Sequence, residues 1–482
     1  MAAHMYSLSG MFGFMLTITM YYIVLFVLVG AFLSAFGAEV FFIELPRALF
    51  ARVRGGAAMT AVGASTLFGM ISGSPAANVA GVGVFTIPLM KRTGYPPEVA
   101  GAIEAASSTG GAFMPPVMGA AAFIMANLTG DTYTHIALIS LVPALIYFFS
   151  VLCFCQTEAR RTGVTAMSSE KRQPILPLIK KGWIYLLPII VLIFLLVTGY
   201  IPYRAAWMAV MTCIVIGIIS KLLTRDKNVT YGRTFKEVGK AFSTGLQGGA
   251  SGSLTVCSLL GTLGIIVSVV FLTGLGFTFT SEMTAMTGGS IPVALLLAFV
   301  ASYVLGMGMT LTAVYVLVAL MMAPALVSMG IPLLSAHMVL FWFSAVSGIS
   351  PPVAVAGYVA ASIAGADPIR TCFNAFKYSA FLFIFPIMFV YSPVLMLNGF
   401  NVDVALSWVS AFFSAICLAG AISGYLLIKD KLWERLALAT ATLLLLFPGA
   451  TTSFIGFALL VTVIGFQVMR NRRTGQAVNV GV

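Results

Sequence analysis

Four short segments rich in glycine, serine, threonine and proline interrupt otherwise apolar stretches of this sequence. Carbonyls and hydroxyls freed from helical hydrogen bonding are hard oxygen ligands, which suit a sodium ion. Half-helix N-termini carry positive partial charge and attract a carboxylate, whereas C-termini attract a cation. The segments therefore predict one sodium site in each half of the chain, with an anionic substrate between them. The candidate binding residues are Ser72, Gly73, Ser74, Asn78, Ser107, Ser108, Thr109, Gly110, Gly111, Pro115, Pro116, Gly306, Gly308, Thr310, Thr312, Ser347, Gly348, Ser350, Pro351 and Pro352.

The four segments fall into two matched pairs, because residues 73–131 recur in altered form as residues 308–367. Paired interruptions in two halves are the best sequence indication of a transporter's binding site. For any single residue, the alternative is that small side chains merely let helices pack closely. Four breaks in two matched pairs favour a binding site over close helix packing. Aligning Gly94 with Gly330 also aligns Pro96 with Pro332, Pro115 and Pro116 with Pro351 and Pro352, and Asp131 with Asp367.

The composition is that of a helical membrane protein. The 482 residues are 60% hydrophobic and only 8% charged, whereas a soluble domain has about 25% charged residues. The net charge of +12 comes from basic clusters between apolar runs, a pattern typical of topology signals. We therefore expect contact with the lipid bilayer and not with nucleic acid.

The elements that hold the four breaks follow from the lengths of the apolar runs. In residues 57–90 and 291–329 each arm beside the break is shorter than the ~20 residues that span a bilayer, which predicts two re-entrant hairpins. Two runs, 98–128 and 335–364, are long enough to span but are interrupted. Residues 157–181 predict a solvated linker, and residues 436–469 predict either two short spans or a third hairpin split at Pro448. The remaining runs predict spanning helices at 11–36, 134–153, 183–198, 203–219, 246–273, 378–397 and 404–428, and interfacial arm helices at 37–56 and 274–290.

The basic residues indicate that the two halves have opposite orientations. If residues 11–36 end in the cytoplasm and both hairpins are re-entrant, every Lys and Arg except Arg204 lies on the cytoplasmic side. The loop after the first hairpin carries Lys91 and Arg92, whereas its counterpart, SMGIP, carries no charge. Equivalent loops with opposite charge bias imply opposite orientation. The sequence therefore predicts an inverted repeat.

Few ionisable groups lie within the predicted spans. Glu104 is the only acid well inside one, and its position about 9 Å from the helix start favours a structural acid over a proton carrier. His135 and His337 are expected at the interface. A substrate carboxylate would have to be held by helix ends and hydroxyls, since no Lys or Arg lies at the midplane. The sequence has neither a phosphate-binding glycine loop nor a nucleophile–histidine–acid set, so we expect no enzyme and no ATP-driven transport on this chain.

One long stretch closely resembles the large membrane subunit of TRAP transporters (tripartite ATP-independent periplasmic transporters), in the branch served by TAXI-type binding proteins: GMISGSPAANVAGVGVFTIPLMKRTGYPPEVAGAIEAASSTGGAFMPPVMGAAAFIMA. Two further stretches look like the matching second-half signatures: LGMGMTLTAVYVLVALMMAPAL and SGISPPVAVAGYVAA. The resemblance runs from about residue 26 to residue 377. One departure is Met309 to Thr312 at the second tip, where the family leads us to expect a proline.

The resemblance implies a sodium-coupled importer of the elevator type, in which a transport domain slides against a scaffold in the bacterial inner membrane. It also implies two partners: a periplasmic TAXI-type substrate-binding protein, and a small four-helix membrane subunit that is either a separate chain or fused upstream. An additional helix is expected before Met11. The substrate would be an organic acid anion such as a dicarboxylate or keto acid, with no cofactor beyond sodium. The implied sodium ligands are Gly73, Ser74, Thr109 and Gly110 in one pair, and Gly308, Thr312, Gly348 and Ser350 in the other.

Under this resemblance the chain divides into five parts. Residues 1–56 are a scaffold helix and arm, 57–131 the first transport-domain repeat, 132–290 scaffold helices with the cytoplasmic linker and second arm, 291–367 the second transport-domain repeat, and 368–482 C-terminal transmembrane helices. The alternatives are an elevator carrier that needs no binding protein, a non-transporting scaffold subunit and a channel. Substrate identity, sodium or proton coupling and oligomeric state are left open.

Overall fold

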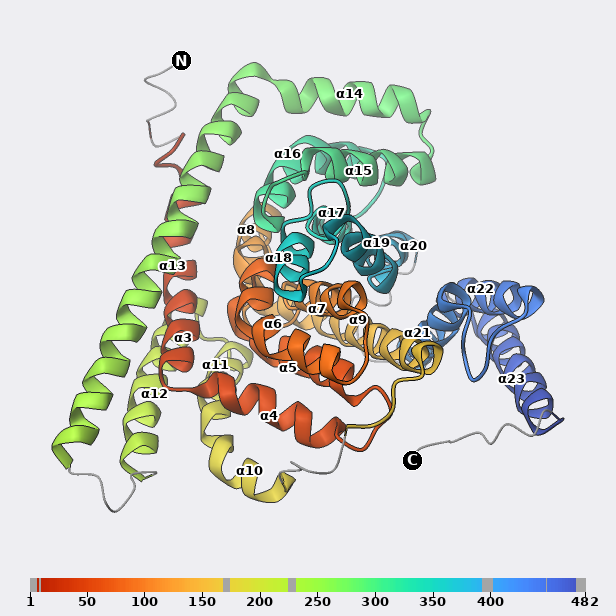
Figure 1. Ribbon diagram of the computed structural model, residues 1–482. Coiled ribbons are helices and arrows are strands. Elements are labelled where there is room, and N and C mark those ends of the chain that lie inside the picture. Colours follow the sequence, from red (N-terminus) through yellow and green to blue (C-terminus); the bar gives the residue numbers. More distant parts are fainter. Residues whose placement is uncertain are drawn as a thin grey trace.

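The computed structural model of the protein describes residue 7 and residues 10–167, 174–223, 231–391, 402–447 and 449–473. Within these residues the fold is helical throughout (Figure 1), and no strand occurs beyond one isolated bridge between Tyr425 and Lys429. In the described chain, 8 helical stretches are long and apolar enough to cross a membrane. The chain is therefore a multi-pass membrane protein, and the predicted class is confirmed.

The same order of elements occurs twice: membrane-length helices, a short arm helix, a helical hairpin and an interrupted helix. The first set comprises α2 (Phe14–Ile18), η1 (Thr19–Ile23), α3 (Val24–Ala35), the arm α4 (Ala38–Phe50), the hairpin α5 (Gly56–Ser72) and α6 (Pro75–Arg92), and the interrupted pair α7 (Pro97–Gly110) and α8 (Gly119–Thr129). The second comprises α13 (Tyr231–Thr273), the arm α14 (Leu275–Thr287), the hairpin α15 (Ile291–Leu305) and α16 (Leu311–Ser328), and the interrupted pair α17 (Leu333–Val346) and α18 (Val355–Ala364). Between the sets lie α9 (Tyr133–Thr162), α10 (Ile175–Gly182), η3 (Trp183–Leu186), α11 (Leu187–Val197) and α12 (Pro202–Leu223), and after them α19 (Pro368–Tyr378), α20 (Phe381–Tyr391), α21 (Val402–Ser423), α22 (Leu432–Leu446) and α23 (Ala450–Arg473).

All four breaks occur close to their predicted positions, but residues 107–110 still belong to α7 and Thr312 already belongs to α16. In the first hairpin α5 ends before Gly73, whose φ of +57° is the left-handed conformation that commonly ends a helix. Pro75 then begins α6, because its fixed φ suits a first helical turn. In the interrupted helices, residues 111–118 separate α7 from α8, and residues 347–354 separate α17 from α18. Both breaks contain a cis peptide bond, at Pro115–Pro116 and at Pro351–Pro352.

The two repeats interlock. The second-half helix α18 packs against α6 and α7 of the first half, and α8 in turn contacts α16 and α17. Around this centre, α3 and the long α13 pack together on one side of the molecule, while α22 and α23 project on the other (Figure 1). The arms α4 and α14 contact the hairpin helices α5 and α16, respectively. The hairpins and interrupted helices thus form a shared core that the outer helices flank.

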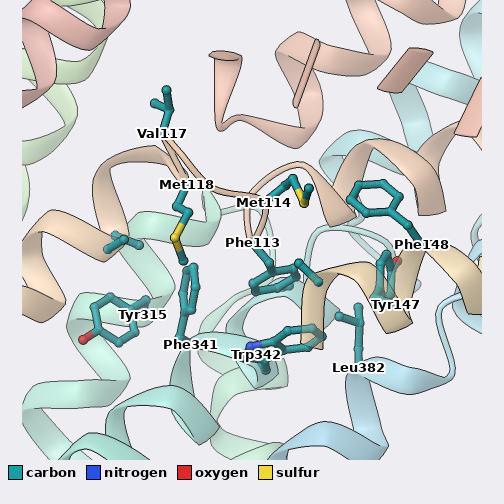
Figure 2. Packing of buried hydrophobic residues seen from close by; sticks show 14 of the residues in the cluster. Phe113, Met114, Val117, Met118, Tyr147, Phe148, Tyr315, Phe341, Trp342 and Leu382 are labelled. Atoms are coloured by element: carbon teal, nitrogen blue, oxygen red, sulfur yellow. The ribbon is translucent and has the colours of Figure 1, made fainter. Parts of the chain in front are cut away.

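An aromatic cluster joins the halves at the centre of this core (Figure 2). The ring of Phe113, from the first break, stacks on Trp342 of α17 with centroids 4.1 Å apart and planes 11° from parallel. Phe341 meets Phe113 edge-on at 4.9 Å, and Tyr147 of α9 meets Trp342 edge-on at 6.1 Å. All four side chains are fully buried. The sequence pattern gave no indication of this contact, because it depends on how the first break meets a helix from the other half of the chain.

Several predicted boundaries were wrong. The span expected at 246–273 is part of α13, which begins at Tyr231 because helix-forming Lys and Glu residues continue it beyond the apolar stretch. The helix expected at 378–397 corresponds to α20, which begins at Phe381 just after α19 ends, and residues 392–397 lie outside the described residues. The span expected to reach residue 428 ends at Ser423, because Gly424 is left-handed. The split predicted in residues 436–469 falls between α22 and α23, although Pro448 itself is outside the described residues.

The predicted linker at 157–181 is exposed over much of its described length, but it begins and ends in helices that the sequence did not predict. Its first residues continue α9 to Thr162, and its last form α10. Glu158 is fully buried, its carboxylate accepting a hydrogen bond from Arg161 Nε at 3.0 Å and lying 4.0 Å from Lys377 Nζ. The first residues of this segment therefore approach α19 through the Glu158–Lys377 pair. Residues 168–173 lie outside the described residues.

Removing the central ring should destabilise the fold. We expect Phe113→Ala to lower the free energy of unfolding by about 3–5 kcal/mol, because it leaves a cavity against Trp342. Thermal unfolding of the purified protein in detergent measures this loss. The control is Phe277→Ala, since that side chain is 83% exposed on α14. Equal unfolding temperatures for the two variants would contradict the central role of the cluster.

Candidate functional site

The tip of the first hairpin packs directly on the break between α7 and α8. A Cβ atom built on Gly73 would lie 2.2 Å from the backbone nitrogen of Gly119, and one built on Gly69 would lie 2.5 Å from Gly111 Cα. Real side-chain atoms do not approach so closely, so these contacts require glycine. Met118, at the end of the break, takes a left-handed φ of +53°. The close approach brings the backbones of two of the four predicted segments together, the first hairpin tip and the first break.

Two unpaired oxygen atoms lie at this first tip. Asn78 is fully buried in α6, and its Nδ2 donates to the carbonyl of Ser65 at 2.9 Å. Within the described residues its Oδ1 has no hydrogen-bond partner, and neither does the buried Oγ of Ser72. A buried polar atom without a partner costs about 1–3 kcal/mol. A cation beside Asn78 would satisfy the Oδ1 oxygen.

The hydroxyls at the end of α7 are buried and bonded within their own helix. Ser107 Oγ donates to the Ile103 carbonyl at 2.6 Å, and Thr109 Oγ1 donates to the Ala105 carbonyl at 2.8 Å. A hydroxyl that donates its proton retains acceptor lone pairs, so these oxygens can still bind a cation. Gly110 instead faces α9, since a Cβ built there would lie 2.7 Å from the Tyr147 ring. The sequence did not foresee that Gly110 faces away from the tip.

Three of the four prolyl carbonyls in the breaks, those of Pro116, Pro351 and Pro352, accept hydrogen bonds from tyrosines. Tyr133 Oη donates to the carbonyls of Pro116 at 2.5 Å and Val117 at 2.8 Å. In the second break, the Tyr303 hydroxyl donates to the Pro351 carbonyl and the Tyr358 hydroxyl to the Pro352 carbonyl. Tyrosines from neighbouring segments thus supply the donors that the interrupted helices lack. These prolines therefore shape the breaks, and their carbonyls already have donors.

The second hairpin tip also contacts its break, but it is more open. A Cβ built on Gly306 would lie 2.4 Å from Ser347 Cβ, whereas one built on Gly308 would meet only Val353, at 3.5 Å. Ser350 Oγ donates to the Val346 carbonyl at 2.5 Å. Gly348, which is half-buried, accepts at its carbonyl from the Ala356 nitrogen at 3.0 Å. At the tip itself Thr310 is exposed and Thr312 is half-buried.

Glu104 links three helices of the first repeat. Its carboxylate accepts hydrogen bonds from Ser65 Oγ of α5 at 2.7 Å, Thr86 Oγ1 of α6 at 2.5 Å and Ser108 Oγ of its own helix at 3.1 Å. These bonds join the hairpin to α7 a few residues from the break, as expected of a structural acid. The sequence identified Glu104 but not Ser65 and Thr86. The only feature of the sequence that could have identified these two residues is that each places a hydroxyl inside an apolar arm of the hairpin.

The two histidines differ in setting. His135 is at the start of α9, partly exposed, with its Nδ1 2.6 Å from Asp131 Oδ2. His337 is 4% exposed in α17, and its Nδ1 lies 2.8 Å from the Tyr315 hydroxyl. His337 is thus enclosed by the second repeat, with Tyr315 of α16 packed against it near the start of α17. A further link was missed entirely: Lys91 Nζ donates to the carbonyl of Ala364, at the end of α18, at 2.6 Å.

A pocket of about 750 Å³ lies between the first hairpin tip and the outer helices. It is lined by Ser72 and Ser74 at the tip, by Glu39 of the arm α4, and by small and apolar residues of α3 and α13. The N-terminus of α6 begins beside it at Pro75, and no side chain caps that end. The N–H groups of a first helical turn have no intrahelical acceptor and carry positive partial charge. Buried breaks beside a pocket of this size are typical of secondary transporters.

Comparison with known proteins agrees with this class. Residues 1–401 match the family model described as "Tripartite ATP-independent periplasmic transporter, DctM component". The C4-dicarboxylate TRAP transporter large permease of Pseudomonas aeruginosa is 25% identical over 375 residues, covering 77% of this chain and 84% of that protein. The isethionate TRAP transporter permease of Oleidesulfovibrio alaskensis is 23% identical over 344 residues, covering 71% of this chain and 52% of that protein. The sialic acid TRAP transporter permease of Haemophilus influenzae is 23% identical over 193 residues, covering 40% of this chain and 31% of that protein.

The match over residues 1–401 places the chain in the DctM family, the large permeases of TRAP transporters. Members of this family are transport proteins and not enzymes. The family resemblance that the sequence motifs indicated is thereby confirmed at the level of the large permease.

Contact between the first tip and its break can be tested with one methyl group. We expect Gly73→Ala to lose about 2–4 kcal/mol of stability, since it combines a left-handed alanine with overlap on Gly119. Gly130→Ala is the control, because Gly130 has a φ of +72° and no atom within 4 Å of its built Cβ. It should lose only the conformational part, about 1 kcal/mol. Equal unfolding temperatures for the two variants would show that the tip is not held against the break.

Glu104 can be tested in the same way. We expect Glu104→Ala to lose about 3 kcal/mol or more, because it leaves three buried hydroxyls without their acceptor and opens a cavity. Glu104→Gln keeps the volume and one acceptor oxygen, so it should lose less. Glu282→Ala, at an exposed position on α14, should leave the unfolding temperature unchanged. A fully stable Glu104→Ala protein would contradict the structural role.

Proposed function

We propose that this chain is the transport subunit of a secondary importer in the bacterial inner membrane, which takes up organic acid anions together with sodium. It receives its substrate from a periplasmic binding protein of the TAXI type and works with a small four-helix membrane subunit. The observation that carries the proposal is the contact of each hairpin tip with the break of an interrupted helix. Membership of a tripartite transporter family supports the two partners.

Sodium binding is supported by the chemistry of the first tip. The Oδ1 of Asn78 and the Oγ of Ser72 are buried oxygens without partners in the described chain. We propose Gly73, Ser74 and Thr109 as further ligands there, with Asn78 in place of Gly110, which packs against Tyr147. For the second site we retain Gly308, Thr312, Gly348 and Ser350. Sodium, as a hard cation, suits carbonyl and hydroxyl oxygens.

The substrate site proposed here is the pocket beside the first tip. Its volume of about 750 Å³ accommodates a small organic acid. The uncapped N-terminus of α6, at Ser74 and Pro75, would attract a carboxylate, and the hydroxyls of Ser72 and Ser74 would donate hydrogen bonds to it. Glu39 lines the same pocket, and its charge would restrict how an anion can lie there.

The relatives support an organic anion without identifying it. Their names specify a C4-dicarboxylate, isethionate and sialic acid, three different small organic acids. We propose the same broad class for this chain, with a dicarboxylate or keto acid as the first candidates. The hairpins are proposed to be re-entrant, and the core of hairpins and interrupted helices to slide as an elevator against α3, α9 and α11–α13.

Two other functions, an independent carrier and a scaffold subunit, can be compared with this proposal. An elevator carrier that works without a binding protein would share the same breaks and the same pocket. A scaffold subunit without transport activity would have no need for unpaired oxygens at a buried tip. The family of the relatives, all named as permeases, favours transport over a scaffold.

The decisive experiment is uptake in proteoliposomes. They contain this chain, its small membrane subunit and a purified TAXI-type binding protein loaded with a radiolabelled dicarboxylate or keto acid. We expect uptake that requires both an inward sodium gradient and the binding protein. Uptake with sodium alone would support the independent carrier, and uptake driven only by a proton gradient would overturn sodium coupling. Absence of uptake in every condition, from folded protein with both partners, would support the scaffold function.

The proposed sodium ligands are tested in the same assay. We expect Thr109→Val and Ser350→Ala to raise the sodium concentration for half-maximal uptake about tenfold or more, because each removes an oxygen from the ion's surroundings. Thr212→Val is the matched control. Its hydroxyl also donates to a carbonyl one turn back, that of Met208 at 2.7 Å, but it is exposed on α12, away from the tips. Unchanged sodium activation in both site variants would refute the ligand assignment.

A further inference from the structure

The C-terminal helices α21–α23 lie beyond the matched family residues, which end at 401, and α21 joins them to the rest of the protein by packing against α9. Helix α22 packs against both α21 and α23 around a separate apolar core. The end of α21, the start of α22 and the end of α23 come together where residues 424–431 turn between helices. Because α21 and α23 are apolar enough to span a membrane, this shared end lies at a membrane–water interface.

The turn is fixed to α23 by buried polar contacts. Gln467 Nε2 donates to Asp430 Oδ1 at 2.7 Å, and its Oε1 accepts from the Leu427 nitrogen at 3.1 Å. Arg470 donates to Glu434 Oε1 at 2.9 Å and to the Lys429 carbonyl at 2.7 Å. A turn held by this many bonds has a defined shape, so the side chains that it presents have fixed positions.

A basic pocket of about 420 Å³ lies at this shared end of the helices. Its walls include Lys429, Lys431 and Arg470, with Asp430 as the one acid. Both lysines are exposed, and neither forms an ion pair within the described residues. The Asp430 carboxyl faces inward to Leu426 and Gln467, and burial raises its pKa above the usual value. Arg470 is paired with Glu434, so the pocket's positive charge comes from the two exposed lysines, and its volume is large enough for a phosphate-bearing headgroup.

An exposed aromatic surface begins beside this pocket. Trp433, in the first turn of α22, is 44% exposed, and its ring meets Phe466 of α23 edge-on at 5.5 Å. Phe466 is 50% exposed and lies one turn before Arg470. Tryptophan is enriched at the headgroup level of membranes, where its ring contacts acyl chains and its N–H contacts water. A phosphate site and an acyl-chain surface are thus adjacent, as a phospholipid requires.

We propose that the pocket of Lys429, Lys431 and Arg470 binds the phosphate group of an anionic phospholipid, whose acyl chains lie along Trp433 and Phe466. Basic pockets between membrane helices on the cytoplasmic side bind such headgroups. The basic residues of this chain mark the same side as cytoplasmic. The ligand is a lipid and not free phosphate, because the apolar surface directly continues the pocket.

The test is native mass spectrometry of the full chain in detergent, with added dioleoylphosphatidylglycerol or dioleoylphosphatidylcholine. We expect the anionic lipid to remain bound and the zwitterionic lipid to be lost. The variant Lys429→Gln/Lys431→Gln removes two charges that take no part in the buried contacts, so it should fold and bind the anionic lipid about tenfold or more weakly. The control, Lys236→Gln/Lys240→Gln, makes the same change in net charge at exposed positions on α13 and should bind normally.

Two measurements on the unaltered protein complete the test. Raising the salt to about 1 M, where the screening length falls to ~3 Å, should release the anionic lipid. Glycerol 1-phosphate, which has the headgroup chemistry but no chains, should compete only weakly. Equal retention of both lipids, equal loss in both double variants, or insensitivity to salt would overturn the proposal. Full displacement by glycerol 1-phosphate would mean that the site takes soluble phosphate compounds.

Discussion

The structure depends on one constraint: non-helical backbone inside a membrane protein must find hydrogen-bond partners within the protein. Four breaks interrupt the helices, and each makes a close contact with another segment of the protein. Glycines let the first tip meet its break at backbone distance, and Gly306 does the same beside Ser347. Tyr133, Tyr303 and Tyr358 donate to three of the prolyl carbonyls. The pairing of tips with breaks is thus a requirement for folding as much as a means of building a site.

The two halves meet this constraint differently. At the first tip the backbone contacts are tight, Asn78 and the hydroxyls at the end of α7 are buried, and Glu104 joins the hairpin to the interrupted helix. At the second tip Gly308 has space around it and Thr310 is exposed. The second tip also lacks the proline that the family pattern led us to expect. The halves therefore share a plan but not a packing density, and the proposed sodium sites would differ in how fully they enclose the ion.

The sequence predicted the breaks, the arms and the helical membrane class because these depend on local composition. A glycine such as Gly73 commonly ends a helix, and a proline such as Pro75 commonly begins one. The length of an apolar run distinguishes a spanning helix from a shorter arm. The sequence did not predict the stacking of Phe113 on Trp342 or the bonds from Ser65 and Thr86 to Glu104, because these depend on contacts between distant segments. The boundary of α13 was missed for another reason: hydrophobicity marks where a helix lies in lipid, whereas the helix itself continues through polar residues.

The bond from Lys91 to the Ala364 carbonyl gives one residue two roles at different times. During membrane insertion a lysine beside an apolar hairpin helps to decide which side of the membrane the loop occupies. In the finished protein the same amine caps α18 of the opposite repeat, whose C-terminus carries negative partial charge. A chain inserted with this loop on the wrong side would therefore lose the cap as well. The same positive charge therefore contributes both to the orientation of the loop and to the packing of the two halves, and a misinserted chain would be less completely packed.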